Sequence, residues 1–196
     1  MSCLSFAHFR QVVAFALAIA SVAISSASAA DEFLFKDGDR VMFLGDSITE
    51  QYQYSSDIET YLTTRFPKWR LQFLNAGISG DTATGGANRF KQHVLDEKPT
   101  VLTINFGMND GGYGKFNQGS CDNFIKNTEK MLEAAKAAGI RVALCSPNAV
   151  DRRYKSNGAE YLETQKQFYA PLAASAAKFG FPFVDQYAIT RTALEK

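Results

Sequence analysis

Short apolar runs alternate with longer amphipathic stretches along the chain from residue 40 onward. Each apolar run follows a turn or a Gly or Pro residue, a pattern that is typical of buried strands. We therefore expect strands at residues 41–44, 71–75, 101–106, 142–146 and 181–184. Pro182 fits the last of them because it falls at the start of the strand.

The amphipathic stretches predict helices at residues 58–66, 87–95, 123–138 and 161–179, with a further helix starting at 189–195. Gly139 marks the end of the third helix, and Pro171 is expected to kink or divide the fourth. Strands that alternate with helices indicate a parallel sheet covered by helices. The pattern therefore predicts one α/β domain over residues 31–196, with about five strands in its central sheet.

The first thirty residues have a different pattern. They hold one charged residue, Arg10, followed by an apolar stretch at 12–24 and small residues at 27–30. This order predicts a secretory signal peptide over residues 1–30, because the apolar stretch is shorter than the roughly 20 residues of a membrane-spanning helix. We expect an exported protein, periplasmic or extracellular, with no integral membrane association after cleavage.

Charge and composition narrow the choice of partners. The chain has 21 Lys and Arg residues and 20 Asp and Glu residues, and removal of Arg10 with the signal peptide leaves the mature chain neutral. A nucleic-acid or anionic-membrane surface needs a clear positive excess, so neither partner is expected. The sequence does not indicate an oligomeric state.

Cysteine and histidine usage bears on cofactors. Cys3 lies in the predicted signal peptide, and the remaining Cys121 and Cys145 either pair in an oxidising compartment or remain unpaired. The apolar run around Cys145 favours a buried, unpaired thiol. The chain has no CxxC or HExxH motif and only two histidines, His8 and His93, so nothing in the sequence suggests a zinc site. Nucleotide binding is disfavoured because the glycine-rich phosphate loops are missing.

Small and polar residues follow the first three predicted strands, where ligands bind in open α/β sheets. Ser47 comes directly after the first strand, which suits a nucleophile at a strand-to-helix turn. Gly80 lies 33 residues further on and Asn109 another 29, each step being about one βα unit, so all three are expected at one edge of the sheet. A glycine N–H and an asparagine amide are suitable donors for an oxyanion hole.

The segments G-D-S-I-T (45–49), N-A-G-I-S-G-D-T (75–82) and G-M-N-D (107–110) resemble the first three sequence blocks of the SGNH (GDSL-type) hydrolases. The resemblance covers most of residues 38–190. It implies a flavodoxin-like, three-layer α/β/α sandwich and ester hydrolysis without a cofactor. It also implies Ser47 as the nucleophile, with the Ser47 N–H, the Gly80 N–H and the Asn109 side chain as oxyanion donors.

The family's last block, D-x-x-H, is missing from this sequence. His93 has Phe90 three positions before it, and no histidine follows Asp185. We expect His93 to be solvated or packed on its helix. Because serine needs a base to take its proton, the chain itself is expected to be nearly inactive. Truncation before the D-x-x-H block is the preferred explanation, and a catalytically inactive pseudoenzyme is the alternative.

Four further residues are candidates for substrate binding. Asp46 and Asp110 flank the key positions and are expected to be hydrogen-bond acceptors that fix their loops. Arg152, in the basic segment 151–155, either grips an acidic or sugar substrate or belongs to a solvated loop. Tyr113, like Tyr52 and Tyr54, either stacks on a sugar ring or packs locally.

The sequence therefore predicts an exported carboxylic-ester hydrolase that forms an acyl-enzyme. Its expected substrates are small-molecule or polysaccharide esters with short acyl groups, such as acetyl groups on carbohydrate. The alternative is a glycan-binding module that uses the same pocket without chemistry.

Overall fold

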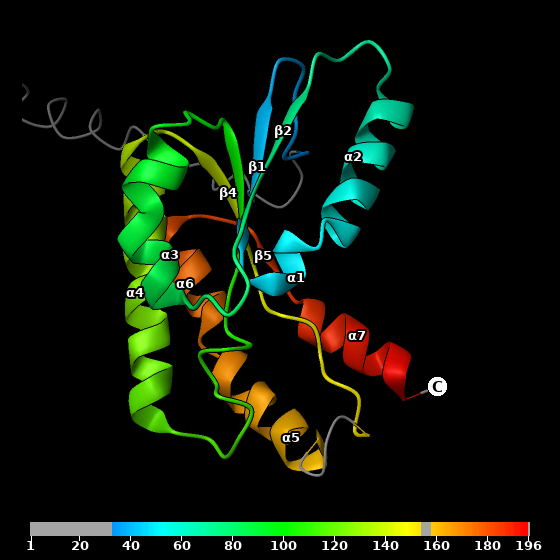
Figure 1. Cartoon of the computed structure of the whole chain (residues 1–196). Coiled ribbons are helices and arrows are strands. Elements are labelled where there is room, and N and C mark those ends of the chain that lie inside the picture. Colours follow the sequence, from blue (N-terminus) through cyan, green and yellow to red (C-terminus); the bar gives the residue numbers. More distant parts are fainter. Residues whose placement is uncertain (1–32, 154–157, 196) are drawn as a thin grey trace, which may run out of the picture.

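The computed structural model describes residues 33–153 and 158–195, and the predicted signal peptide lies outside them. Its centre is a parallel five-stranded sheet with the order β2-β1-β3-β4-β5 (Figure 1). The strands are β1 (Arg40–Gly45), β2 (Gln72–Gly77), β3 (Val101–Asn105), β4 (Arg141–Cys145) and β5 (Phe183–Val184). This order is the flavodoxin-like one, and the predicted α/β fold is confirmed.

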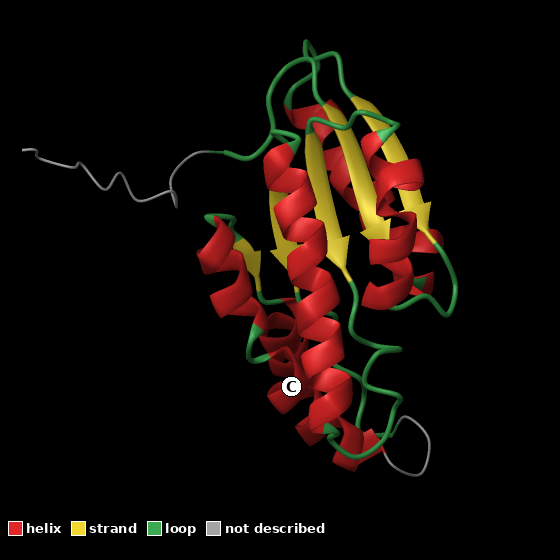
Figure 2. Cartoon of the chain, turned by 90° about the vertical axis from the view of Figure 1, so that its left-hand side faces the viewer, coloured by secondary structure: helices red, strands yellow, loops and turns green. Residues whose placement is uncertain are grey.

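Helices lie on both faces of the sheet and complete three layers. Helices α3, α4 and α6 cover one face, in front of the strands in Figure 2, and α2 lies against the other (Figure 1). Their bounds are α1 (Ser47–Glu50), α2 (Gln53–Arg65), α3 (Ala83–Phe90) with its π-helical continuation η1 (Lys91–Leu95), α4 (Gln118–Ala137), α5 (Gly158–Tyr169), α6 (Leu172–Phe179) and α7 (Gln186–Leu194). None of the described helices is both long and apolar enough to span a bilayer.

Every predicted strand is present, with ends that differ from the prediction by two residues at most. The largest difference at a strand start is in β5, which begins at Phe183 rather than at residue 181. The N–H of Phe181 donates to the carbonyl of Ala176 at 3.0 Å and closes the end of α6. Residue 181 therefore belongs to the helix terminus and not to the sheet.

Several helices begin earlier than the apolar periodicity predicts, because their first turns are polar. The side chain of Asn117 accepts a hydrogen bond from Ser120 N–H at 2.9 Å, and α4 starts at residue 118 rather than 123. Helix α2 likewise starts at residue 53 rather than 58. The predicted break at Pro171 is confirmed, since it separates α5 from α6. Gly139, with φ of +70°, follows the end of α4.

Helix α3 starts in a glycine-rich segment that has low helix propensity. A Cβ atom on Gly86 would lie 2.6 Å from the ring of Phe106 and 3.2 Å from Sδ of Met131. Glycine thus allows α3 to approach the end of β3 and the neighbouring α4 closely. Tertiary packing compensates for the weak local propensity, which is why periodicity alone places the helix start four residues too late.

The core lies on both faces of the central strands, as expected for a parallel sheet. The larger cluster packs against the face that α3, α4 and α6 cover. The smaller one holds Val41, Phe43 and Val101 against the partly buried Phe35 and Ile58. On the same face, over β3, β4 and β5, lies an open, mainly apolar groove of about 460 Å³.

Candidate active site

Ser47 lies at the turn that joins β1 to the short helix α1. Asp46 caps this helix, because its Oδ1 accepts a hydrogen bond from Ile48 N–H at 3.0 Å. Ser47 is half-buried. Within the described part of the chain, neither its hydroxyl nor its N–H is engaged in a hydrogen bond. Both groups are therefore available to a ligand at the carboxyl edge of the sheet.

Gly80 lies in the loop that follows β2. Its φ of +76° falls in the left-handed region that favours glycine, although a Cβ there would meet no atom within 4 Å. Two hydrogen bonds join this loop and its strand to the Ser47 turn. Nδ2 of Asn75 donates to the carbonyl of Thr49 at 2.6 Å, and Ile78 N–H donates to a carbonyl at the end of β1 at 3.2 Å.

Asn109, in the loop after β3, connects the other two segments. Its Nδ2 donates to the backbone carbonyl of Asp81 at 2.8 Å and lies 3.5 Å from Oδ2 of Asp46. One amide hydrogen is thus committed to Asp81, while the other has a contact at the long limit of hydrogen bonding and can turn to a ligand oxygen. The immediate neighbours of Ser47 and Gly80 meet at the Asn109 side chain.

Asp46 and Asp110 are both largely shielded from solvent at this edge. Burial raises the pKa of Asp46, opposed by the hydrogen bond from Ile48. Burial also raises the pKa of Asp110 to about 7, although its carboxylate accepts a hydrogen bond from Ala83 N–H at 3.0 Å. Both side chains hold backbone in place, in the manner that the sequence predicts for loop-fixing acceptors.

A match to a known protein family identifies the family of this chain. Residues 43–196 match the GDSL-like lipase/acylhydrolase family. The chain belongs to this family. Esterase TesA of Pseudomonas aeruginosa is 32% identical to it over 114 residues, which make up 56% of this chain and 51% of TesA. The resemblance of the three sequence blocks to GDSL-type (SGNH) hydrolases is thereby confirmed.

Solved structures share the fold of this GDSL-like chain. A gut microbial diltiazem-metabolizing enzyme superposes with a TM-score of 0.71 and 34% identity, covering 79% of this chain and 38% of that protein. An acetylxylan esterase from Geobacillus stearothermophilus superposes with a TM-score of 0.73 over 84% of this chain and 83% of that protein, at 20% identity. The chain spans about half the length of TesA and less than half of the first of these structures.

Arg89 is a residue of this GDSL-like site that the sequence analysis missed. Its Nε donates to Oδ2 of Asp81 at 2.8 Å, and its Nη2 donates to the carbonyl of Gly45 at 3.2 Å. The ion pair is well shielded, since the side chains of Arg89 and Asp81 are only 11% and 12% exposed. The one available signal was weak: Asp81 is part of the second block, and Arg89 follows it by eight residues on the predicted helix.

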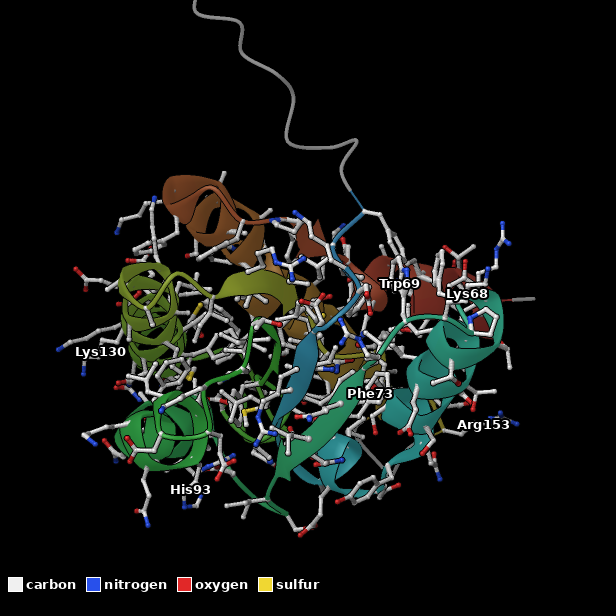
Figure 3. All side chains as sticks on the ribbon, turned by 90° about the horizontal axis from the view of Figure 1, so that it is seen from above. Lys68, Trp69, Phe73, His93, Lys130 and Arg153 are labelled. Atoms are coloured by element: carbon white, nitrogen blue, oxygen red, sulfur yellow. The ribbon has the colours of Figure 1, made fainter. Side chains whose placement is uncertain are left out.

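Of three other candidates of the GDSL-like chain, one is exposed and two have contacts elsewhere. His93 is exposed in η1, at the end of a helix that runs back from the carboxyl edge, and it projects outward (Figure 3). Asp185 caps α7 by accepting a hydrogen bond from Ala188 N–H at 3.0 Å. Arg152 is exposed, with its guanidinium 3.9 Å from the carboxylate of Glu195. Within the described residues, no contact joins these three side chains to Ser47, Gly80 or Asn109.

The tyrosines near the edge differ in their surroundings. Tyr113 packs against Tyr161 with ring centroids 5.2 Å apart, and its hydroxyl donates to Oδ1 of Asn109 at 3.3 Å. Tyr54 packs edge-on against Phe43 and hydrogen-bonds through its hydroxyl to Thr49. Both therefore pack locally, whereas Tyr52 is 58% exposed.

The thiols and acids offer no metal centre in the described residues. Cys121 and Cys145 are both buried and unpaired. Across residues 33–153 and 158–195, no group of three or more His, Cys, Asp or Glu side chains is arranged to hold a metal ion. What the site presents is a serine hydroxyl beside backbone and amide donors.

Proposed function

We propose that this GDSL-like chain is the serine-bearing part of an exported esterase that removes short acyl groups, acetyl groups in particular, from carbohydrate. The observation that carries the proposal is the Asn109 amide, which joins the residues beside Ser47 and Gly80. We expect a substrate oxygen placed there to meet one hydrogen of Asn109 and the N–H groups of Ser47 and Gly80, which make no hydrogen bond within the described residues. Such donors stabilise the oxyanion of an acyl-transfer transition state.

In the proposed reaction, Oγ of Ser47 attacks the ester carbonyl carbon and its proton passes to a base. The tetrahedral oxyanion then collapses, the C–O bond to the alcohol breaks, and the base returns the proton to the leaving alcohol. Water attacks the acyl-enzyme by the same route and releases the carboxylic acid. Every step uses an acid–base group that the described residues around Ser47 do not supply, since His93 lies exposed on η1.

We therefore propose that an Asp-x-x-His pair outside residues 1–196 provides the base. The chemistry requires one, because an unassisted serine is a poor nucleophile at neutral pH. In the acetylxylan esterase of similar fold, variants described as catalytic replace a serine, an aspartate and a histidine. Similarity to an arylesterase and to an acetylxylan esterase supports ester hydrolysis, and the second of these favours the acetyl substrate.

The test compares the natural gene product with its Ser47→Ala variant. With p-nitrophenyl acetate, the gene product is expected to turn over, and Ser47→Ala is expected to lose at least about a thousandfold in kcat. A long-chain p-nitrophenyl ester is expected to react more slowly, and acetylated xylo-oligosaccharides to release acetate. Equal rates with and without Ser47 would overturn the proposal.

Export is tested separately. The protein recovered from periplasm or medium is expected to begin at residue 30 or 31, which N-terminal sequencing and intact mass will show. Recovery of the protein in the cytoplasm with residues 1–30 attached would contradict it.

One observation favours a second candidate, a glycan-binding module without catalysis. No histidine of residues 33–153 or 158–195 reaches Ser47. Calorimetric titration with acetylated oligosaccharides distinguishes the two, because the module predicts binding with no acetate released by the natural gene product. Turnover that depends on Ser47 excludes it.

A further inference from the structure

The guanidinium of Arg89 makes a two-way contact at the centre of the site. From α3 it reaches the carboxylate of Asp81 through Nε and the carbonyl of Gly45 through Nη2, at 2.8 and 3.2 Å. Gly45 is the last residue of β1 and stands two positions before Ser47. One side chain thus connects the loop after β2 to the strand that presents the serine.

Asp81 carries this connection onward in two directions. Its carboxylate accepts from Thr82 N–H at 2.9 Å as well as from Arg89, which fixes the side chain. Its backbone carbonyl accepts the amide of Asn109 at 2.8 Å. Its own N–H closes the turn at Gly80 by donating to the carbonyl of Ile78 at 3.1 Å. The orientation of both proposed oxyanion donors therefore depends on where Asp81 is held.

The charges around the site explain why a cation is needed at this position. The carboxyl groups of Asp46, Asp81 and Asp110 face the same region, and the charge of Asp81 contributes to the raised pKa of both neighbours. A negative charge that develops on a substrate oxygen beside three carboxylates is disfavoured unless some of them are protonated or paired. Arg89 forms an ion pair with Asp81, the carboxylate next to Gly80 in the chain.

We propose that Arg89 is a positioning residue, which sets the Gly80 N–H and the Asn109 amide relative to Ser47 by holding Asp81 against the end of β1. The inference rests on the proposed function, because the donors it positions are those of the proposed oxyanion hole. It assigns to the Arg89–Asp81 pair a role in the rate of the acyl-transfer step, beyond a contribution to folding.

The planar guanidinium suits this role better than an ammonium. It offers several N–H donors in a fixed geometry, so that Nε and Nη2 address two acceptors at once. A lysine at the same place keeps the charge but acts as a flexible point donor. Arg89→Lys therefore separates the charge from the two-way contact, while Arg89→Gln removes both.

The kinetic experiment uses the natural gene product with p-nitrophenyl acetate. Arg89→Gln is expected to lower kcat about tenfold to a hundredfold with little change in KM, since small displacements of catalytic groups cost rates of that order. Arg89→Lys is expected to recover only part of the loss. The matched control is Arg141→Gln, which breaks the ion pair of Arg141 with the buried Asp39 and should lower stability without lowering kcat.

A second readout does not depend on activity. Hydrogen–deuterium exchange of the natural gene product is expected to accelerate in the peptide that spans 78–83 for Arg89→Gln, while Arg141→Gln leaves this peptide unchanged. If Arg89→Gln unfolds the chain, Arg89→Lys and Asp81→Asn provide the same comparison. The effects of Arg89→Lys and Asp81→Asn are expected to be coupled. The variant that carries both substitutions should lose no more kcat than the worse of the two single variants.

The outcomes are distinguishable. Wild-type kcat and wild-type exchange in Arg89→Gln would overturn this inference and leave the proposed function intact. A loss of kcat in Arg141→Gln as large as that in Arg89→Gln would reduce the effect to general stability and would also overturn it. Activity that survives in Ser47→Ala would overturn the proposed function, and with it the positioning role given to Arg89.

Discussion

The carboxylate of Asp110 accepts a hydrogen bond from the N–H of Ala83 at 3.0 Å. Asp110 directly follows Asn109, and α3 begins three residues after Gly80. This hydrogen bond therefore joins the loop of one proposed oxyanion donor to the helix that follows the other. Because an anion at a helix N-terminus is favourable while its burial is not, the two effects oppose each other at this contact. Burial dominates, and the pKa of Asp110 rises to about 7.

This raised pKa predicts how stability depends on pH. Between the usual value of 3.8 and about 7, folded Asp110 keeps a proton that the unfolded chain has released. The contribution of Asp110 to the free energy of unfolding is therefore fully present below about pH 4 and is lost as pH rises through 7. Its slope in that window is at most about 1.4 kcal/mol per pH unit.

The measurement is urea unfolding of residues 31–196 and of Asp110→Asn between pH 4 and 8. The amide oxygen of the variant can still accept from Ala83, so the variant should lack the decline and gain on the wild type as pH rises. Parallel stability curves for the two proteins would contradict the assignment.

Asn109→Ala is expected to reduce kcat of the natural gene product about a hundredfold to a thousandfold, because it removes one of the proposed oxyanion donors. KM should change little, since the contact is made in the transition state. Steady-state kinetics with p-nitrophenyl acetate measure both. Asn88→Ala, at an exposed position on α3, serves as the control. A raised KM with unchanged kcat would assign Asn109 to substrate binding instead.

Gly86→Ala is expected to lower the free energy of unfolding by about 1–3 kcal/mol. The added methyl group would meet the ring of Phe106 at 2.6 Å, and rigid neighbours cannot move aside cheaply. The control is Gly119→Ala on α4, where the nearest atom, on Asn117, is 3.4 Å away and alanine favours the helix. Denaturant titration of both variants checks the difference. Equal stabilities would show that α3 can shift away from the sheet.

Cys121 and Cys145 are expected to be unreactive toward a thiol reagent such as DTNB in the native protein. Burial raises the pKa of both thiols, that of Cys145 to about 12, and the thiolate is the reacting form. Both should react rapidly in denaturant, which shows that they are reduced. Rapid labelling of the native protein would contradict their burial, and one missing pair of thiols in denaturant would reveal a disulfide.

The strands and the approximate helices were predictable because they depend on local patterns. Val41 to Leu44 and Val101 to Ile104 are apolar in sequence and buried in the structure, with Thr103 as the one polar position. The beginnings of α2 and α4 were missed because their first turns are polar, and only the cap at Asn117 marks one of them. Local periodicity carries no information about such turns.

The site was predictable as far as three sequence blocks at successive strand ends allow. Those blocks led to Ser47, Gly80 and Asn109, whose loops the structure brings together through Asp81 and Asp46. The sequence analysis did not identify Arg89, because this side chain contacts Asp81 and a backbone carbonyl 44 positions earlier in the chain. A backbone acceptor has no residue type, so no sequence motif can signal it.

The order of the strands also bears on how the chain reaches its native state. Val41 of β1 pairs with Phe73 of β2 and with Val101 of β3, which are 32 and 60 residues away along the chain. Closing such long loops costs entropy before any contact is gained, so β1 acquires its neighbours slowly. During synthesis, β1 lacks its second neighbour until residue 105 has left the ribosome. This delay suits the proposed export, because a polypeptide that has not yet folded can pass through a narrow translocation pore.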